Sequence, residues 1–222
     1  MQMNVCYVVG AGENCGIDFI PQPGDYVIAA DAGLTYLEQS GITANLVIGD
    51  FDTLRRKPNH PNVITLNEEK DDTDTFAAIQ QGIEKGYTVF HLHGCTGGRI
   101  EHTIANIQLL AYLSENLMQG FLFDQHNIIT TITNAKLTFP QYGKGYISVF
   151  SHSGKSEGVS LNGLKYRLDS ATVTNAFPIG VSNEFIGSES VISVKKGTLI
   201  IVYPRKLGGL LSDEKSIKHC RV

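Results

Sequence analysis

The sequence predicts two domains: an N-terminal α/β domain on a parallel sheet with helices on both faces, then a C-terminal antiparallel β-sandwich. Over roughly the first half of the chain, strand-length apolar runs alternate with segments of helical period, which is typical of a parallel sheet with covering helices. From Asn127 onward no convincing helical period is present, and segments rich in β-branched and aromatic residues follow one another. The 222 residues are enough for one large domain or two small ones, and the change of pattern favours two.

The expected elements of the first part follow in a regular order. Strands are predicted at residues 5–9, 26–30, 46–48, 63–66, 88–92 and 121–123. A short helix is expected from Leu34 to the stop at Gly41, a second over residues 75–85, and a longer third from Ile100 through Leu110. In parallel sheets of this kind, ligands bind beyond the carboxyl ends of the strands, so residues that follow the strands are the first place to look for a site.

The second part is predicted to hold strands at residues 128–133, 146–150, 171–174, 191–194 and 199–203. Lys196-Gly197 suits a tight hairpin turn between the last two of these strands. The domain boundaries expected from these patterns are 1–125 for the α/β domain and 126–206 for the β-sandwich. The polar segment 207–222 is expected to be a partly disordered tail.

Composition narrows the class of protein. With 18 basic and 22 acidic residues the formal net charge is −4, which gives no electrostatic footprint for nucleic acid. The opening residues lack the layout of a secretory signal, and no apolar run approaches the roughly 20 residues that cross a bilayer. The four cysteines are scattered without a C-x-x-C pair, as free thiols in a reducing cytosol would be. We therefore expect a cytoplasmic protein that binds neither nucleic acid nor membrane.

Two acidic clusters suggest a divalent cation. Asp50 and Asp52 follow an apolar run, and in extended backbone residues i and i+2 point the same way, so both carboxylates could reach one Mg²⁺ ion. The alternative is a polar turn after a strand. Asp71, Asp72 and Asp74 precede a helical pattern. They could simply cap that helix, with Asp71 as N-cap and Asp74 three residues later, although three crowded acids exceed what capping needs.

A third cluster suggests phosphate. Gly97-Gly98-Arg99 stands where a strand passes into a helix, so free N–H groups and a guanidinium would meet an anion there. A tight turn with a surface arginine is the alternative, and no P-loop motif is present. His102 could reach a phosphate, whereas alternating His91 and His93 are interpreted as ordinary strand residues. Metal and phosphate together point to phosphoryl-type transfer.

Five blocks in the same order resemble the thiamine pyrophosphokinases of the bacterial type. The blocks are Asp31-Ala32-Gly33, Gly49-Asp50-Phe51-Asp52-Thr53, Lys70-Asp71-Asp72-Thr73-Asp74, Gly97-Gly98-Arg99-Ile100-Glu101-His102 and Gly180-Val181-Ser182-Asn183-Glu184-Phe185. The resemblance implies transfer of a pyrophosphoryl group from ATP to the hydroxyl of thiamine, with Mg²⁺, giving thiamine diphosphate and AMP. It also implies a homodimer whose active sites lie between subunits.

The resemblance assigns roles by matching position. The magnesium carboxylates would be Asp50, Asp52 and Asp74; the catalytic groups Asp71, Asp74 and Arg99; the ATP contacts Asp31, Thr96, Gly97, Gly98, Arg99 and His102; and the thiamine contacts Ser182, Asn183 and Phe185.

The chain departs from the family pattern in two places. Glu101 stands where many members carry aspartate, which lengthens the reach of that acid by one methylene. No tryptophan is present, so any ring that stacks on thiamine must be Phe or Tyr, with Phe177 and Phe185 as candidates. Two other readings stay open: a magnesium-dependent kinase or pyrophosphokinase for another heterocyclic alcohol, and a thiamine or nucleotide sensor without catalysis.

Overall fold

The computed structural model describes residues 4–54, 56–67, 69, 72–207, 210–211 and 218–221. Among the candidate site residues, Asp71 lies outside this described part. The chain divides into two compact units. Unit 1 comprises Met1–Leu109 and Leu117–Gln125, and unit 2 comprises Leu110–Asn116 and His126–Val222.

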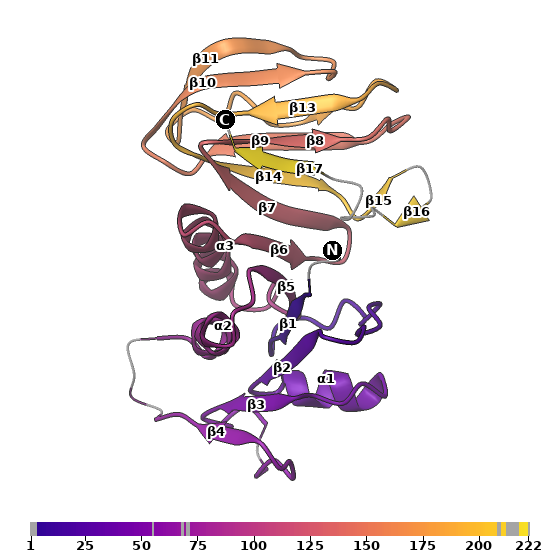
Figure 1. Cartoon of the computed structure of the whole chain (residues 1–222), viewed down its shortest axis with the longest axis vertical. Coiled ribbons are helices and arrows are strands. Elements are labelled where there is room, and N and C mark those ends of the chain that lie inside the picture. Colours follow the sequence, from indigo (N-terminus) through magenta and orange to yellow (C-terminus); the bar gives the residue numbers. More distant parts are fainter. Residues whose placement is uncertain are drawn as a thin grey trace. The chain divides into compact units, whose positions relative to one another are not determined.

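Unit 1 is built on a parallel sheet (Figure 1). Its strands are β1 (Cys6–Val9), β2 (Tyr26–Ala30), β3 (Leu46–Gly49), β4 (Val63–Thr65), β5 (Val89–His93) and β6 (Gln119–Phe123). They lie in the order β6-β5-β1-β2-β3-β4, and every neighbouring pair is parallel. Strands β1, β3 and β5 are buried along their whole length, as expected for a sheet covered on both sides.

Three helices accompany this sheet: α1 (Gly33–Gln39), α2 (Asp74–Glu84) and α3 (Ile100–Glu115). Figure 1 shows α1 and α2 on opposite sides of the parallel strands. Thr73 caps α2, because its Oγ1 accepts a hydrogen bond from the Phe76 N–H at 3.2 Å. The alternative in which Asp71 is the N-cap therefore does not hold, and Asp74 is the first helical residue. None of the described helices has the length and apolar character to span a membrane.

The sheet order places a crevice beside β1. From β1 the chain builds β2, β3 and β4 to one side, then returns to add β5 and β6 on the other side. The chain therefore leaves the carboxyl end of β1 toward one edge of the sheet and the carboxyl end of β5 toward the other edge. Such a switch point is where open α/β sheets bind their ligands.

Apart from Leu110–Asn116, which includes the end of α3, the described part of unit 2 is built from antiparallel strands. They are β7 (Asn127–Thr133), β8 (Ala135–Phe139), β9 (Tyr146–Ser151), β10 (Lys155–Asn162), β11 (Leu168–Thr174), β12 (Asn183–Glu184), β13 (Ser190–Ser193), β14 (Thr198–Pro204), β15 (Lys206–Leu207), β16 (Leu210–Leu211) and β17 (Lys218–Arg221). Strands β12-β9-β14-β7 form one ladder and β11-β10-β13-β8-β17 another. Buried Phe139 makes edge-to-face contacts with Phe185 and Tyr203.

One expectation for unit 2 was wrong. Lys196-Gly197 does not close a hairpin, because β13 pairs with β10 and β8 whereas β14 pairs with β7 and β9. The turn instead passes the chain from one ladder to the other, with the Gly197 N–H bonded to Asn134 Oδ1 at 2.9 Å. Within the segment 207–222, the described residues Lys218–Arg221 form β17, which pairs with β8 on the side away from β13.

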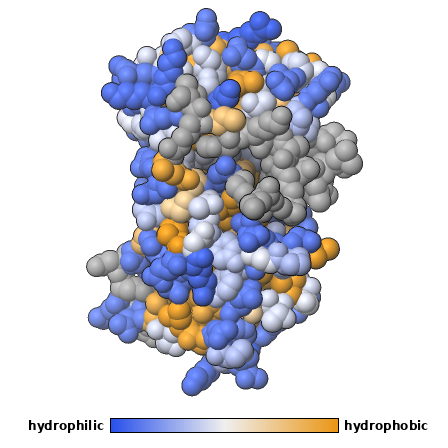
Figure 2. Space-filling model, in the orientation of Figure 1, coloured by the Kyte–Doolittle hydropathy of each residue, from blue (hydrophilic) through white to orange (hydrophobic). Residues whose placement is uncertain are grey.

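The surface carries apolar side chains among polar ones. Figure 2 shows this mixture on one face of the molecule, where hydrophilic residues predominate. Several large exposed apolar side chains belong to one segment of unit 2, namely Phe177, Ile179, Val181 and Ile186.

Candidate active site

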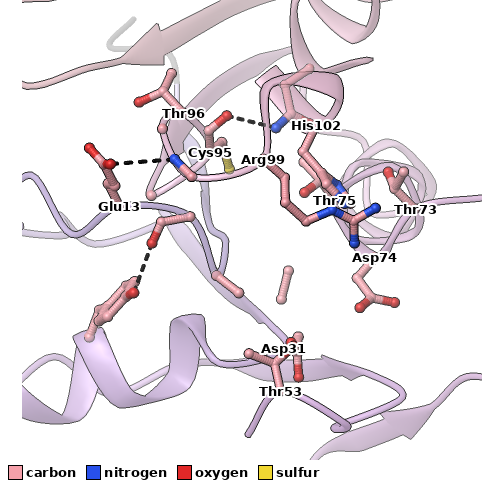
Figure 3. Close-up of a pocket in the computed structure, with 18 of the residues that line it drawn as sticks. Glu13, Asp31, Thr53, Thr73, Asp74, Thr75, Cys95, Thr96, Arg99 and His102 are labelled. Atoms are coloured by element: carbon pink, nitrogen blue, oxygen red, sulfur yellow. Dashed lines mark hydrogen bonds between the residues drawn. The ribbon is translucent and has the colours of Figure 1, made fainter. Parts of the chain in front are cut away.

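A cavity of about 640 Å³ opens at the carboxyl ends of β1, β2, β3 and β5, entirely within unit 1 (Figure 3). The residues of chemical interest that line it are Glu13, Asp31, Tyr36, Asp50, Asp52, Thr53, Asp72, Thr73, Asp74, Thr75, Cys95, Thr96, Gly97, Gly98, Arg99, His102 and Asn106. The structure therefore brings together all the described residues that the sequence analysis assigned to Mg²⁺ or to ATP. It adds Glu13, which the sequence analysis did not single out.

Three carboxylates of this cavity form a compact group. Asp31, Asp50 and Asp52 each place one oxygen so that all three oxygens lie within 4.8 Å of one another. Asp31 is 5% exposed, and its Oδ1 has no hydrogen-bond partner. A buried carboxylate oxygen without a partner is unfavourable unless a cation or a donor binds it. Asp74 lines the same cavity but does not belong to this group of described residues.

The backbone that presents these acids is unusual in two places. Asp31 has φ of 51° and Phe51 has φ of 65°, both in the left-handed region that residues with a side chain seldom adopt. The Asp52 N–H bonds Asp50 Oδ1 at 3.2 Å, so the segment turns at Phe51. Asp50 and Asp52 thus meet through a turn, whereas the sequence analysis expected extended backbone. Left-handed residues clustered at a functional site are a known way of storing local strain.

The glycine loop after β5 forms the opposite wall. Gly97 and Gly98 have φ of 74° and 58°, and α3 begins two residues later. Asn106 of α3 holds this loop, because its Nδ2 donates to the Cys95 carbonyl at 2.7 Å. Thr96 is buried and donates from Oγ1 to Asp124 Oδ1 at 3.1 Å, so its hydroxyl supports the loop.

Arg99 and Glu101 form an exposed ion pair at the cavity, with Nε and Oε1 2.7 Å apart. The hydrogen bond from Arg99 is the main reason why the pKa of the Glu101 carboxyl lies below its usual range. Exposed pairs of this kind contribute little stability, so the guanidinium can exchange partners at small cost. His91 and His93 are buried among aromatic rings, with His93 stacked on Phe123 at 4.4 Å.

In unit 2 the segment around Asn183 is held tightly. A side chain at Gly180 would overlap the Val149 carbonyl, and Ser182 takes φ of 56° with its N–H bonded to Ser148 Oγ at 3.0 Å. Asn183 is buried: its Oδ1 accepts from the Tyr166 N–H at 2.9 Å, and its Nδ2 donates to the Tyr166 carbonyl at 2.6 Å.

The predicted thiamine contacts therefore differ in accessibility. Ser182 is exposed, whereas Asn183 and Phe185 are 3% exposed, and Phe185 packs against Phe139 and Tyr142. The Tyr166 side chain, which the sequence analysis did not single out, is exposed next to them. The position of Tyr166 depends on its two backbone hydrogen bonds with the Asn183 side chain, and no local sequence motif indicates that long-range contact.

Fold and site together define an α/β catalytic domain with a carboxylate-lined cavity at its switch point, followed by an antiparallel β domain. This combination is typical of an enzyme that transfers phosphoryl groups.

Comparison with known proteins identifies the family. Residues 22–121 match the model of the thiamin pyrophosphokinase catalytic domain, and residues 134–199 match that of its vitamin B1 binding domain. The thiamine pyrophosphokinase of Bacillus subtilis (strain 168) is 30% identical over 182 residues, which cover 79% of this chain and 85% of that protein.

Solved structures agree. Thiamine pyrophosphokinase from Bacillus subtilis superposes with a TM-score of 0.82 at 27% identity, over 90% of this chain and 99% of that chain. A thiamin pyrophosphokinase family protein from Enterococcus faecalis gives 0.75 at 27% identity, over 90% and 98% of the two chains. The chain belongs to the thiamin pyrophosphokinase family, and its activity is that of a thiamine diphosphokinase. The predicted fold class, family and reaction are thereby confirmed.

Proposed function

We propose that the cavity of unit 1 is the place where this enzyme holds ATP and Mg²⁺ for pyrophosphoryl transfer to thiamine. The observation that carries the proposal is the buried, unpartnered Oδ1 of Asp31 beside the Asp50 and Asp52 carboxylates, at the switch point of the sheet. Oxygen ligands of this kind fit a hard divalent cation, and Mg²⁺ is commonly held by one or two carboxylates plus substrate phosphates.

The three carboxylates would share the work of holding the cation. Asp50 and Asp52 would bind it from the turn after β3, and Asp31 would bind it from the buried side. Asp74, on the first turn of α2, would add a further negative group to the same cavity. When bound, Mg²⁺ neutralises charge on the triphosphate and orients it. Asp71 stays a prediction from the sequence.

The glycine loop would hold the phosphates being transferred. N–H groups of Gly97 and Gly98 at the start of α3, with the Arg99 guanidinium and His102, suit phosphate oxygens. The thiamine hydroxyl then attacks the β-phosphorus in line, the bond to the α-phosphate oxygen breaks, and AMP leaves. The hydroxyl proton passes to a carboxylate of the cavity. Positioning and electrostatic stabilisation would supply most of the acceleration.

Thiamine would be recognised by the segment of unit 2 around Asn183. The Lys165 ammonium lies over the exposed ring of Tyr166, 5.4 Å from its centroid. Thiamine carries a fixed positive charge and would take the place of that ammonium on the ring. Asn183 would act by positioning Tyr166, and Ser182 by direct contact. The exposed apolar side chains of Phe177 and Ile179 suit a contact between two copies of the chain, in keeping with the proposed homodimer.

A mass-resolved product assay tests the reaction and the metal together. ATP, Mg²⁺ and thiamine are supplied and each is omitted in turn; AMP and thiamine diphosphate should appear in equal amounts only when all three are present. Asp50→Asn should abolish turnover and leave the circular dichroism spectrum unchanged. Asp169 is an exposed residue of unit 2, and the control variant Asp169→Asn should keep the turnover of wild type. ADP in place of AMP would favour a simple kinase, and no turnover would favour a sensor.

The thiamine assignment has its own test. Asn183→Ala should raise the KM for thiamine and leave the KM for ATP unchanged, because the amide holds Tyr166 and touches nothing in unit 1's cavity. Tyr166→Phe keeps the ring and serves as the matched control, whereas Tyr166→Ala should reproduce the effect of Asn183→Ala. If all three variants had the thiamine KM of wild type, this segment would not belong to the thiamine site.

A further inference from the structure

The side chain of Glu13 lies on the glycine loop, where the proposed function places the phosphates of ATP. The Gly98 N–H donates to Glu13 Oε1 at 3.4 Å, one of the dashed contacts in Figure 3. A Cβ built at Gly97 would overlap the carboxylate end of Glu13, so that side chain lies directly against the loop. A carboxylate of the protein itself thus occupies an anion-binding position.

The main chain fixes Glu13 in this place. The Glu13 N–H donates to the Thr96 carbonyl at 2.9 Å, and the Gly12 N–H donates to the Gly94 carbonyl at 2.7 Å. From the other side, the Tyr36 hydroxyl donates to the Gly12 carbonyl at 2.8 Å. The segment after β1 is therefore tied to the loop after β5, and only the exposed Glu13 side chain is left to swing away.

A carboxylate and a phosphate compete for the same donor. Both are anionic acceptors for N–H groups at the start of a helix. They cannot share the Gly98 N–H without placing two negative charges next to each other, which is unfavourable even in a partly solvated site. The pocket already holds the carboxylates of Asp31, Asp50 and Asp52, so a phosphate entering beside Glu13 would meet a further like charge.

We propose that Glu13 is an internal competitor of the ATP phosphates. In the free protein its carboxylate satisfies the glycine loop, and it must leave as the triphosphate binds. The fraction of protein with the loop uncovered then sets the apparent affinity for nucleotide. This inference rests on the proposed binding of ATP in the unit 1 cavity and adds a residue that determines how tightly ATP is held.

The test measures binding of nucleotide to the full chain by calorimetry, with Mg²⁺ and α,β-methylene-ATP, in which the bond that breaks is replaced. Glu13→Gln removes the charge at nearly constant size, and Glu13→Ala removes the side chain. Both should bind the analogue about threefold to tenfold more tightly than wild type, which corresponds to the loss of one competing hydrogen bond. Asp18→Asn is the matched control, since Asp18 is an exposed carboxylate on the same segment that does not line the cavity.

Two further probes locate the effect. Inorganic triphosphate should show the same gain in the Glu13 variants, whereas adenosine should bind all variants equally. Unchanged or weaker binding of the analogue, or an equal gain for adenosine, would overturn the inference; weaker binding would mean that Glu13 contacts the nucleotide directly. If wild type binds neither phosphate probe, the proposed function of the cavity fails first, and that result is distinct from an unchanged affinity in the variants.

Discussion

Replacement of Asp31 by asparagine should separate the stability of the metal-free protein from its ability to bind metal. Asn has nearly the same shape as Asp and tolerates the left-handed backbone that φ of 51° requires. The change therefore removes a buried charge with little change in packing. Because Asp31 is grouped with Asp50 and Asp52, its charge opposes theirs when no cation is bound.

The size of the effect follows from the spacing. Two unit charges 4.8 Å apart repel by about 0.9 kcal/mol at the dielectric constant of water and by about 3.5 kcal/mol at an effective value of about 20. Asp31 is buried, Asp50 is half-buried and Asp52 is exposed, so the site lies between these limits. We expect Asp31→Asn to raise the free energy of unfolding without metal by about 1–3 kcal/mol.

Chemical denaturation in EDTA measures the stability of the metal-free protein, and the same measurement in saturating Mg²⁺ gives the stability gained from the metal. Wild type should gain about 2.7 kcal/mol when free Mg²⁺ is 100-fold above its Kd, whereas Asp31→Asn should gain less than half of this. Asp169→Asn changes the net charge equally at an exposed position and should behave like wild type. An Asp31→Asn variant less stable than wild type in EDTA would contradict the repulsion among the three carboxylates. A variant that still gained the full increment from Mg²⁺ would contradict metal binding by Asp31.

Three further predictions concern the fold. Thr73→Ala removes the N-cap of α2 and should lower the free energy of unfolding by about 1 kcal/mol, whereas Thr73→Ser should restore it; equal thermal midpoints for all three proteins would show that the cap is not needed. Burial raises the pKa of the Cys6 and Cys95 thiols to about 12, from 9.0 for an accessible thiol. The folded state keeps these thiols protonated while the unfolded state ionises them, so stability should fall as the pH rises from about 9 toward 12. Cys6→Ala with Cys95→Ala should flatten that decline, and an unchanged slope would assign it to other groups. At pH 8 a thiol reagent should label exposed Cys220 and leave both buried thiols until denaturant is added.

Much of unit 1 was predictable because its strands are buried on both faces. Continuous apolar runs such as Tyr26–Ala30 predict a strand without help from tertiary contacts. The acidic and glycine blocks were likewise visible, since they follow those strands and the parallel order brings the strand ends to one edge.

Unit 2 was less predictable because its strands mix polar and apolar positions. Ala135–Phe139 and Lys155–Asn162 were not expected as strands; the second contains Gly158 and shifts its register against β11. The sequence also gave no means of telling a hairpin from a crossing between ladders at Lys196-Gly197, because the same turn residues serve both.

The site residues that sequence reasoning missed depend on long-range contacts. Glu13 reaches the glycine loop only because its backbone bonds to residue Thr96, and Tyr166 is placed by Asn183. The alternative in which Asp71 caps the helix fails for a local reason, since Thr73 stands one residue before the helix and offers the hydroxyl.

The most direct measurement is an experimental structure of the enzyme with Mg²⁺ and α,β-methylene-ATP. The cation should lie among Asp31, Asp50 and Asp52 at about 2.0–2.1 Å from the carboxylate oxygens that bind it, with the phosphates on the Gly97 and Gly98 N–H groups. A cation bound elsewhere, with the Asp31 carboxylate still unpartnered, would contradict the central claim that this cavity is the catalytic site.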